Sequence, residues 1–341
     1  MLKARGDEEK AALALPNRQQ LEESEPLAFM TIDEIFHGKG RQRRRLQFDA
    51  PRIEPWIVAL SHCHLSESHP DPRCQQALRF IDLIERERAR PGTNFPYGDY
   101  GIFIDWCSLY QSDASTGEHR SPEEAQSYSA AMEEMDLWYG HRAVRLVVID
   151  VPVGATNSSS AGGGGGCRPQ SERAWPVFEL GMNSIARQCL HHGRAQPTLF
   201  AGGVPAKAPG PRTAKRFAQL LGGKSFSNEG TDRPLVIGLY AASLERMLSA
   251  AGELQCGGLG WGDDDAEALA EVLPLCTAAR SINLSRNLGI GDKGIVAICK
   301  ALAAGAAPRV KEVNLQHLHI GPEASWALRK VNLVRDTSWY V

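Results

Sequence analysis

The chain has 341 residues, of which 38 are basic and 40 acidic, and 43% are hydrophobic. This length is enough for about two domains that fold without disulfides or metals. The formal net charge of −2 gives no overall attraction to nucleic acids or anionic membranes, so we expect neither as a partner. No run of about eighteen apolar residues occurs, which excludes a membrane-spanning helix.

The first fifty residues are polar, and the sequence predicts a disordered or irregular arm there. The segment begins with charged residues and has no apolar core, so we expect no secretory signal. The arm ends in a basic run at residues 39–45, from Lys39 to Arg45. We expect a cytoplasmic protein, with nuclear import through this run or a solvated flexible arm as alternatives. The eight cysteines form no C-x-x-C pair and are expected to be free thiols.

Residues 51–200 alternate between apolar runs of strand length and segments with helical spacing. This alternation predicts an α/β domain with a parallel sheet, whose sites lie at the carboxyl ends of the strands. Ser121 followed by Pro122 is typical of a helix start. The predicted strands cover 56–60, 100–105 and 144–151, and the predicted helices cover 75–88, 121–139 and 174–188.

Two loose stretches interrupt this pattern. Residues 154–168 contain five consecutive glycines and predict a flexible insertion between the third strand and the third helix. Residues 201–250 predict a Pro- and Gly-rich linker followed by a helical region, with helices at 214–221 and 234–248.

Residues 251–341 contain a repeat. One frame has the form L-x-x-L-x-L-x-x-N, and related frames lie 28 residues earlier and 31 residues later, each followed by a glycine turn and a helix. This strand-turn-helix unit resembles the ribonuclease-inhibitor type of leucine-rich repeat and predicts a short α/β solenoid. The frames are Ala251, Leu254, Cys256, Leu259; Ala279, Ile282, Leu284, Asn287; and Val310, Val313, Leu315, Leu318.

The repeat family implies a role for the final position of each frame. Asn287 is expected to satisfy backbone groups in the turn, whereas Leu259 and Leu318 occupy the matching positions. A further frame from Leu328 to Asp336 is interpreted as a truncated closing repeat. Such arrays are mostly protein-binding surfaces, so we expect a protein partner at residues 251–341. The alternative is that the repeats only cover the flank of the α/β domain.

Three short motifs follow one another in the α/β domain. They are D-x-C-x-x-x-Q from Asp105, M-x-x-x-Y from Met135 and R-x-W-x-x-x-E from Arg173. Their order over residues 53–190 resembles the fungal heterokaryon-incompatibility (HET) domain and the related TIR domain, and implies a flavodoxin-like parallel sheet. Trp175, Glu179 and the following leucine match the W-C-x-x-E-L motif of TIR domains, with Pro176 at the position of its cysteine.

The resemblance implies signalling by self-association and, in some TIR domains, cleavage of NAD at the nicotinamide-ribose bond. Glu179 matches the catalytic glutamate, and a carboxylate there could stabilise a ribosyl cation. We expect Ser61, Asp105 and Trp175 to contribute to NAD binding, with NAD as a substrate and no required cofactor. The alternative is that Trp175 packs its helix against the sheet and that Glu179 pairs with Arg173 or a cap.

Two other chemistries are weaker alternatives. His62, His64 and His69 could form a zinc site, although polar loop residues explain the pattern equally well, and we expect no metal. Cys107 as a nucleophile would need a base such as His141, and core packing is the competing interpretation. We therefore expect an intracellular signalling or scaffold protein, with an NAD glycohydrolase as the alternative.

Overall fold

The computed structural model describes most of the chain. The described residues are 14–29, 57–62, 64–66, 69–90, 100–112, 119–141, 144–149, 170–189, 198–201, 209–226 and 228–341. The basic run at 39–45 and the predicted insertion at 154–168 lie outside them. The fold is mixed α/β, and its contacts divide the chain into two compact units, each described by itself. The first unit contains residues 1–138, 143–171 and 197–204, and the second contains residues 139–142, 172–196 and 205–341.

The first unit contains a parallel sheet with the strand order β2-β1-β3-β4. Both faces of its central strands are buried, as expected from continuous apolar runs. The three predicted strands are confirmed, the first shifted by one residue and the other two with shorter bounds, whereas β4 is too short to leave a clear pattern. The carboxyl ends of β1 and β3 lie where the strand order reverses, which is where α/β sheets usually bind ligands. The strands are β1 (Ile57–Ser61), β2 (Gly101–Phe103), β3 (Val144–Ile149) and β4 (Leu199–Ala201).

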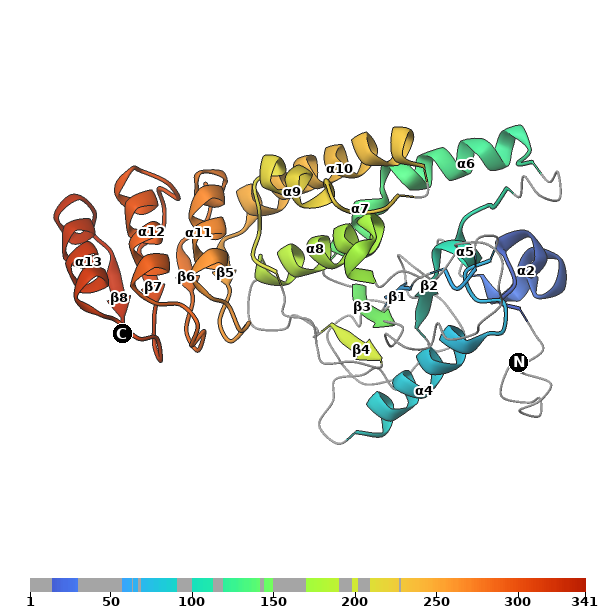
Figure 1. Cartoon of the computed structure of the whole chain (residues 1–341), viewed down its shortest axis with the longest axis horizontal. Helices are drawn as coiled ribbons and strands as arrows, with labels where there is room; N and C mark the ends of the chain where they lie inside the picture. Colours follow the sequence, from blue (N-terminus) through green and yellow to red (C-terminus); the bar gives the residue numbers. More distant parts are fainter. Residues whose placement is uncertain are drawn as a thin grey trace, which may run out of the picture. The chain divides into compact units, whose positions relative to one another are not determined.

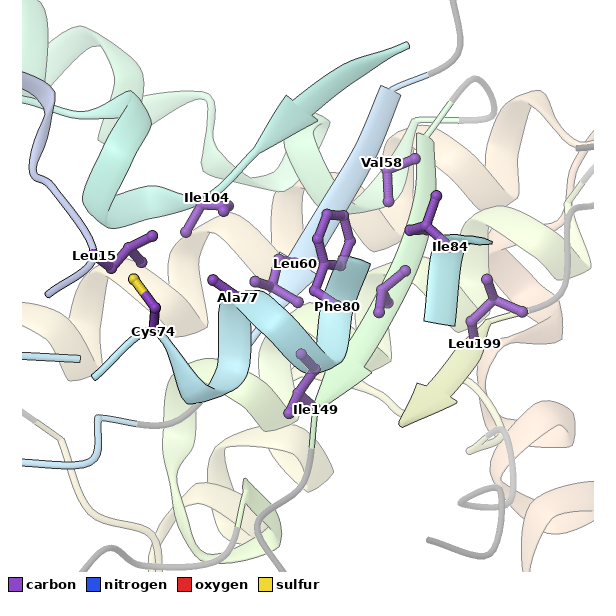
Figure 2. Close-up of a cluster of buried hydrophobic side chains, with 11 residues drawn as sticks. Leu15, Val58, Leu60, Cys74, Ala77, Phe80, Ile84, Ile104, Ile149 and Leu199 are labelled. Carbon is purple, nitrogen blue, oxygen red and sulfur yellow. The ribbon is translucent and has the colours of Figure 1, made fainter. Parts of the chain in front are cut away.

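One helix, α4 (Gln75–Ala89), packs against this sheet. Figure 2 shows Ala77, Phe80 and Ile84 projecting from it toward the side chains of the strands. These positions recur at intervals of three and four residues, so the helix presents one apolar face. The cluster also contains Leu15, which is 8% exposed.

The segment around Leu15 differs from the irregular arm that the sequence predicts. Residues 14–29 contain α2 (Arg18–Ser24) and the 3₁₀ helix η2 (Pro26–Ala28). Asn17 and Gln20 form a capping box at the start of α2, which satisfies the first backbone N–H groups. One buried leucine, a polar cap and hydrogen bonds to residues that follow β2 hold this segment, and its polar composition gives no sign of them.

Between β2 and β3 the chain forms α5 (Asp105–Ser108), α6 (Pro122–Glu133) and α7 (Met135–Gly140). The sequence predicts one helix over 121–139, but the chain interrupts it at Glu134. The predicted start is confirmed, because Ser121 caps α6 together with Glu124.

Three helices precede the repeats in the second unit. The bounds of α8 (Ala174–Gln188) and α9 (Ala214–Leu221) agree with the prediction. The third, α10 (Glu229–Ala250), begins five residues before the predicted start at Pro234. Glu229 and Asp232 lie in its first turn, where negative charge favours a helix N-terminus.

The repeats form a second parallel sheet with the order β5-β6-β7-β8. Leu254, Ile282 and Val313 are paired at the centres of three strands, in the register that the repeat frames predict. Figure 1 shows α11, α12 and α13 side by side along this sheet. The elements are β5 (Glu253–Gln255), α11 (Asp263–Val272), η4 (Leu273–Leu275), β6 (Ser281–Asn283), α12 (Asp292–Ala303), β7 (Glu312–Asn314), α13 (Pro322–Val334) and β8 (Ser338–Tyr340).

The closing frame predicted from Leu328 to Asp336 is wrong. Leu328 and Val331 lie on α13, and their spacing of three residues places them on one buried helix face. The closing strand is β8, which begins two residues after Asp336. Apolar residues three positions apart, such as Leu328 and Val331, are compatible with a helix as well as with a repeat strand.

Candidate functional site

His62 and Asp105 meet at the carboxyl edge of the first sheet. His62 Nε2 lies 3.0 Å from Asp105 Oδ1, which also accepts the Trp106 backbone N–H at 2.7 Å. The His62 side chain is 3% exposed and that of Asp105 43%. Burial alone would raise the pKa of Asp105, but the charge and hydrogen bond of His62 lower this pKa to about 2. Asp105 is therefore a fixed negative charge at this edge.

Ser61 is the last residue of β1 and directly precedes His62. Its backbone carbonyl accepts the Gln170 Nε2 amide at 2.9 Å, and the same amide donates to the Ile149 carbonyl at 2.8 Å. Gln170 therefore joins the ends of β1 and β3. The Ser61 hydroxyl is buried and has no hydrogen-bond partner among the described residues. Gln170 begins the short 3₁₀ helix η3 (Gln170–Glu172), and a single glutamine there carries no recognisable signal in the sequence.

The loop after β1 is held by Asp71. Its Oδ2 accepts the backbone N–H groups of Gln76 and Ala77, both at 2.9 Å, at the start of α4. Burial raises the pKa of Asp71, and these hydrogen bonds offset part of that effect. Cys74, immediately before α4, has a φ of 51°, a conformation uncommon for a residue with a side chain. Asp71 supplies the helix cap that Cys74 does not provide.

The three histidines proposed as zinc ligands have other contacts. The His62 and His64 rings stack with centroids 6.3 Å apart, and His69 Nδ1 accepts the Asp71 backbone N–H at 3.0 Å. Across the described ranges, no three His, Cys, Asp or Glu residues are grouped so that they could hold a metal ion. The geometry of these residues is that of an ordered loop beside the sheet edge.

Cys107 and Gln111, in the D-x-C-x-x-x-Q motif, hold the N-terminal segment. The Cys107 thiol donates to the Pro16 carbonyl at 3.2 Å, and Gln19 Nε2 donates to the Gln111 carbonyl at 2.8 Å. Burial raises the pKa of the Cys107 thiol well above its usual value, so the thiol stays protonated and is a poor nucleophile. These contacts favour the packing interpretation of Cys107.

Trp175 and Glu179 belong to the second unit, whereas Ser61 and Asp105 belong to the first. Trp175 Nε1 donates to Asp232 Oδ2 on α10 at 3.2 Å, and its ring meets Phe178 edge-on. Trp175 thus links α8 to α10. Glu179, one helical turn further along α8, is only 7% exposed. NAD cleavage by Glu179 stays a prediction of the sequence resemblance.

Asn287 is the central polar side chain of the repeats. It is completely buried, and its Nδ2 donates to the carbonyls of Cys256 at 2.7 Å and Leu284 at 2.8 Å. Its Oδ1 accepts the backbone N–H groups of Leu259 at 2.9 Å and Trp261 at 3.1 Å. One amide therefore satisfies four backbone groups from two successive frames. The expected role of Asn287 in the turn is confirmed.

Two aspartates join successive helices of the repeats. Asp263 Oδ1 accepts the N–H groups of Gly291 at 2.7 Å and Gly294 at 2.9 Å. Asp292 accepts those of Gly321 at 2.7 Å and Glu323 at 3.1 Å. Each aspartate begins one helix and binds the start of the next, where unsatisfied N–H groups attract negative charge. The sequence pattern predicts the glycine turns, but it does not indicate this function of the neighbouring aspartates.

Arg335, which follows α13, holds the segment that connects α12 to β7. Its guanidinium donates to the carbonyls of Leu302, Ala306, Ala307 and Val310, which follow or end α12. These carbonyls lie 25 to 33 residues earlier in the chain. No local pattern in the sequence indicates this role of Arg335, because its contacts cross a whole repeat.

The β5–β8 sheet carries polar side chains on the face opposite its buried central residues. Asn283 Nδ2 donates to Gln255 Oε1 at 3.1 Å, so neighbouring strands are also joined on this face. Tyr340, at the end of the row, is 47% exposed. We call this surface the exposed strand face. It comprises one row of Glu253, Ser281, Glu312 and Ser338, and a second row of Gln255, Asn283, Asn314 and Tyr340.

A scan of protein-family models finds none that matches the chain, and a search of curated proteins finds no matching sequence. None of the helices in the described ranges has both the length and the apolar character needed to cross a membrane.

The ion pair of Asp105 makes stability depend on acidity. The pKa of Asp105 is 3.8 unperturbed and about 2 in the folded chain, so its contribution is complete above about pH 4 and is lost as the pH falls through about 2. We expect the urea midpoint of Asp105→Asn to fall less than that of the wild type over this pH window. Asp336→Asn, at an exposed position of the second unit, is the control. An unchanged acid dependence in Asp105→Asn would contradict the pairing.

NAD cleavage can be tested separately. The resemblance predicts that the full chain releases nicotinamide from NAD, measured by liquid chromatography, and that Glu179→Gln lowers the rate about a hundredfold. Glu172→Gln, at an exposed position just before α8, is the matched control. Absence of release at high protein concentration, where self-association is favoured, would refute the prediction for this chain.

Proposed function

We propose that this chain is a scaffold or signalling protein that binds a protein partner through the exposed strand face, as a leucine-rich-repeat array. The observation that carries the proposal is the buried amide of Asn287, which bonds the backbone of two successive frames. An asparagine at this position is part of the L-x-x-L-x-L-x-x-N frame of leucine-rich repeats. The in-register centres Leu254, Ile282 and Val313 support the same interpretation.

The chemistry of the exposed strand face suits a protein. Its amides and hydroxyls can both donate and accept hydrogen bonds, as a polypeptide surface requires. Tyr340 adds an aromatic side chain of the type that is enriched at interfaces. The face spans four strands spaced about 4.8 Å apart, and repeat arrays use such extended surfaces for recognition.

The first unit would act by self-association in this proposal. The order β2-β1-β3-β4 is that of the first four strands of flavodoxin-like sheets, which supports the HET/TIR-like interpretation. Partner binding by the repeats and association of the first unit would then be separate functions of one chain.

Charge and bulk placed on the exposed strand face test the proposal. Ser281→Arg combined with Glu312→Arg changes two paired positions whose side chains lie outside the buried core. We expect the amount of captured partner to fall at least about tenfold, because a misplaced charge disrupts a complementary interface. The measurement is affinity capture with quantitative mass spectrometry, using the full chain as bait.

Arg329→Glu, an exposed position on α13, is the control and should capture the partner as the wild type does. A double variant that captures the same proteins in the same amounts would show that the exposed strand face is not the binding surface. Thermal melting of the variants separates this result from unfolding.

A further inference from the structure

A groove of about 570 Å³ runs between α12 and α13. Its volume lies within the range of about 300–1,000 Å³ that is usual for binding pockets. Its lining is mostly apolar and includes Val296, Ala303 and Val331. The groove lies on the helical side of the repeats and shares no residue with the exposed strand face.

Trp326 stands at this groove with 61% of its surface exposed. The ammonium of Lys330 lies 3.7 Å from the centre of its ring, which is a cation–π contact. Tryptophan is enriched among the residues that dominate protein interfaces, because it buries a large rigid surface with few rotatable bonds. Much of the ring surface of Trp326 is thus available to a partner.

The charges of the groove are unevenly placed. Lys300 and Lys330 line it toward the carboxyl ends of their helices, and neither forms an ion pair within the described ranges. Glu323 lines the opposite end, seven residues and about 10 Å before Lys330 along α13. An apolar centre therefore separates two cations from one carboxylate.

We propose that this groove binds an amphipathic, acidic helix of a partner protein. Two packed helices leave a groove into which a third can fit, with its apolar stripe against Trp326 and the lining. Acidic side chains of the bound helix would lie near Lys300 and Lys330, in accordance with the charge of that end. Glu323 makes the groove unfavourable for a uniformly anionic surface such as a lipid membrane.

Two synthetic peptides test the proposal on the full chain. One is a fluorescein-labelled helix with leucine along one face and glutamate on the other, and the second has lysine in place of each glutamate. By fluorescence anisotropy, the glutamate peptide should bind saturably and at least about tenfold more tightly than the lysine peptide. No saturable binding, or equal affinity for both peptides, would overturn the proposal.

Variants locate the binding. Trp326→Ala should weaken the glutamate peptide at least about tenfold, and Lys300→Glu with Lys330→Glu should reverse the charge preference. Arg329→Glu, on α13 but outside the groove lining, is the matched control and should leave the affinity unchanged. These side chains are exposed, and melting temperatures will show whether the variants remain folded.

Two further results would refute the assignment. Binding that survives Trp326→Ala would place the peptide elsewhere, and binding to phosphatidylserine vesicles without binding to the peptide would identify a membrane site. The Ser281→Arg and Glu312→Arg variant should still bind the glutamate peptide. This measurement keeps the groove distinct from the exposed strand face, so either proposal can fail without the other.

Discussion

The buried amide of Asn287 is the interaction on which the repeats depend. The turns after β5 and β6 bring backbone N–H and C=O groups into the interior, where unsatisfied groups are costly. Asn287 satisfies four of them, because its carboxamide combines two donors with two acceptor positions, a combination that among neutral side chains only the longer glutamine shares. Asp263 and Asp292 do the same for the helix starts. Side chains thus join one repeat to the next where the short strands cannot.

Because these side chains hold the turns, the repeats can carry two different surfaces, the exposed strand face and the groove between α12 and α13. The buried amide of Asn287 and the partly exposed carboxylates of Asp263 and Asp292 hold the turns and the helix starts, and the outward positions of the strands carry mostly polar side chains. On the helical side, α12 and α13 lie together and leave an apolar groove with Trp326 exposed. In the first unit, hydrogen bonds from Asp71 and Gln170 likewise fix the loops at the carboxyl edge of the sheet.

The sequence predicted features that arise from local patterns. The bounds of α8 and α9 and the Ser121 cap follow from spacing or capping within a few residues, and the register of the repeat frames follows from one short pattern that recurs at intervals of 28 and 31 residues. Contacts across long sequence separations left no such pattern: Gln170 reaches Ser61 109 residues away, and Arg335 reaches back a whole repeat. Leu15 is not recognisable as a core residue, because the few leucines of this polar segment show no regular spacing. The frame at Leu328 failed because helix and repeat spacing coincide there.

Amide hydrogen exchange, followed by nuclear magnetic resonance, tests the role of Asn287 most directly. The N–H groups of Leu259 and Trp261 lie outside helices and strands, yet they bond to Asn287 Oδ1. We predict that both amides exchange as slowly as those in the strands, because their hydrogen bonds break only when the repeats unfold. In Asn287→Leu, which copies the residue at 259 and 318, this protection should be lost. Rapid exchange of both amides in the wild type, or unchanged protection in the variant, would contradict the account.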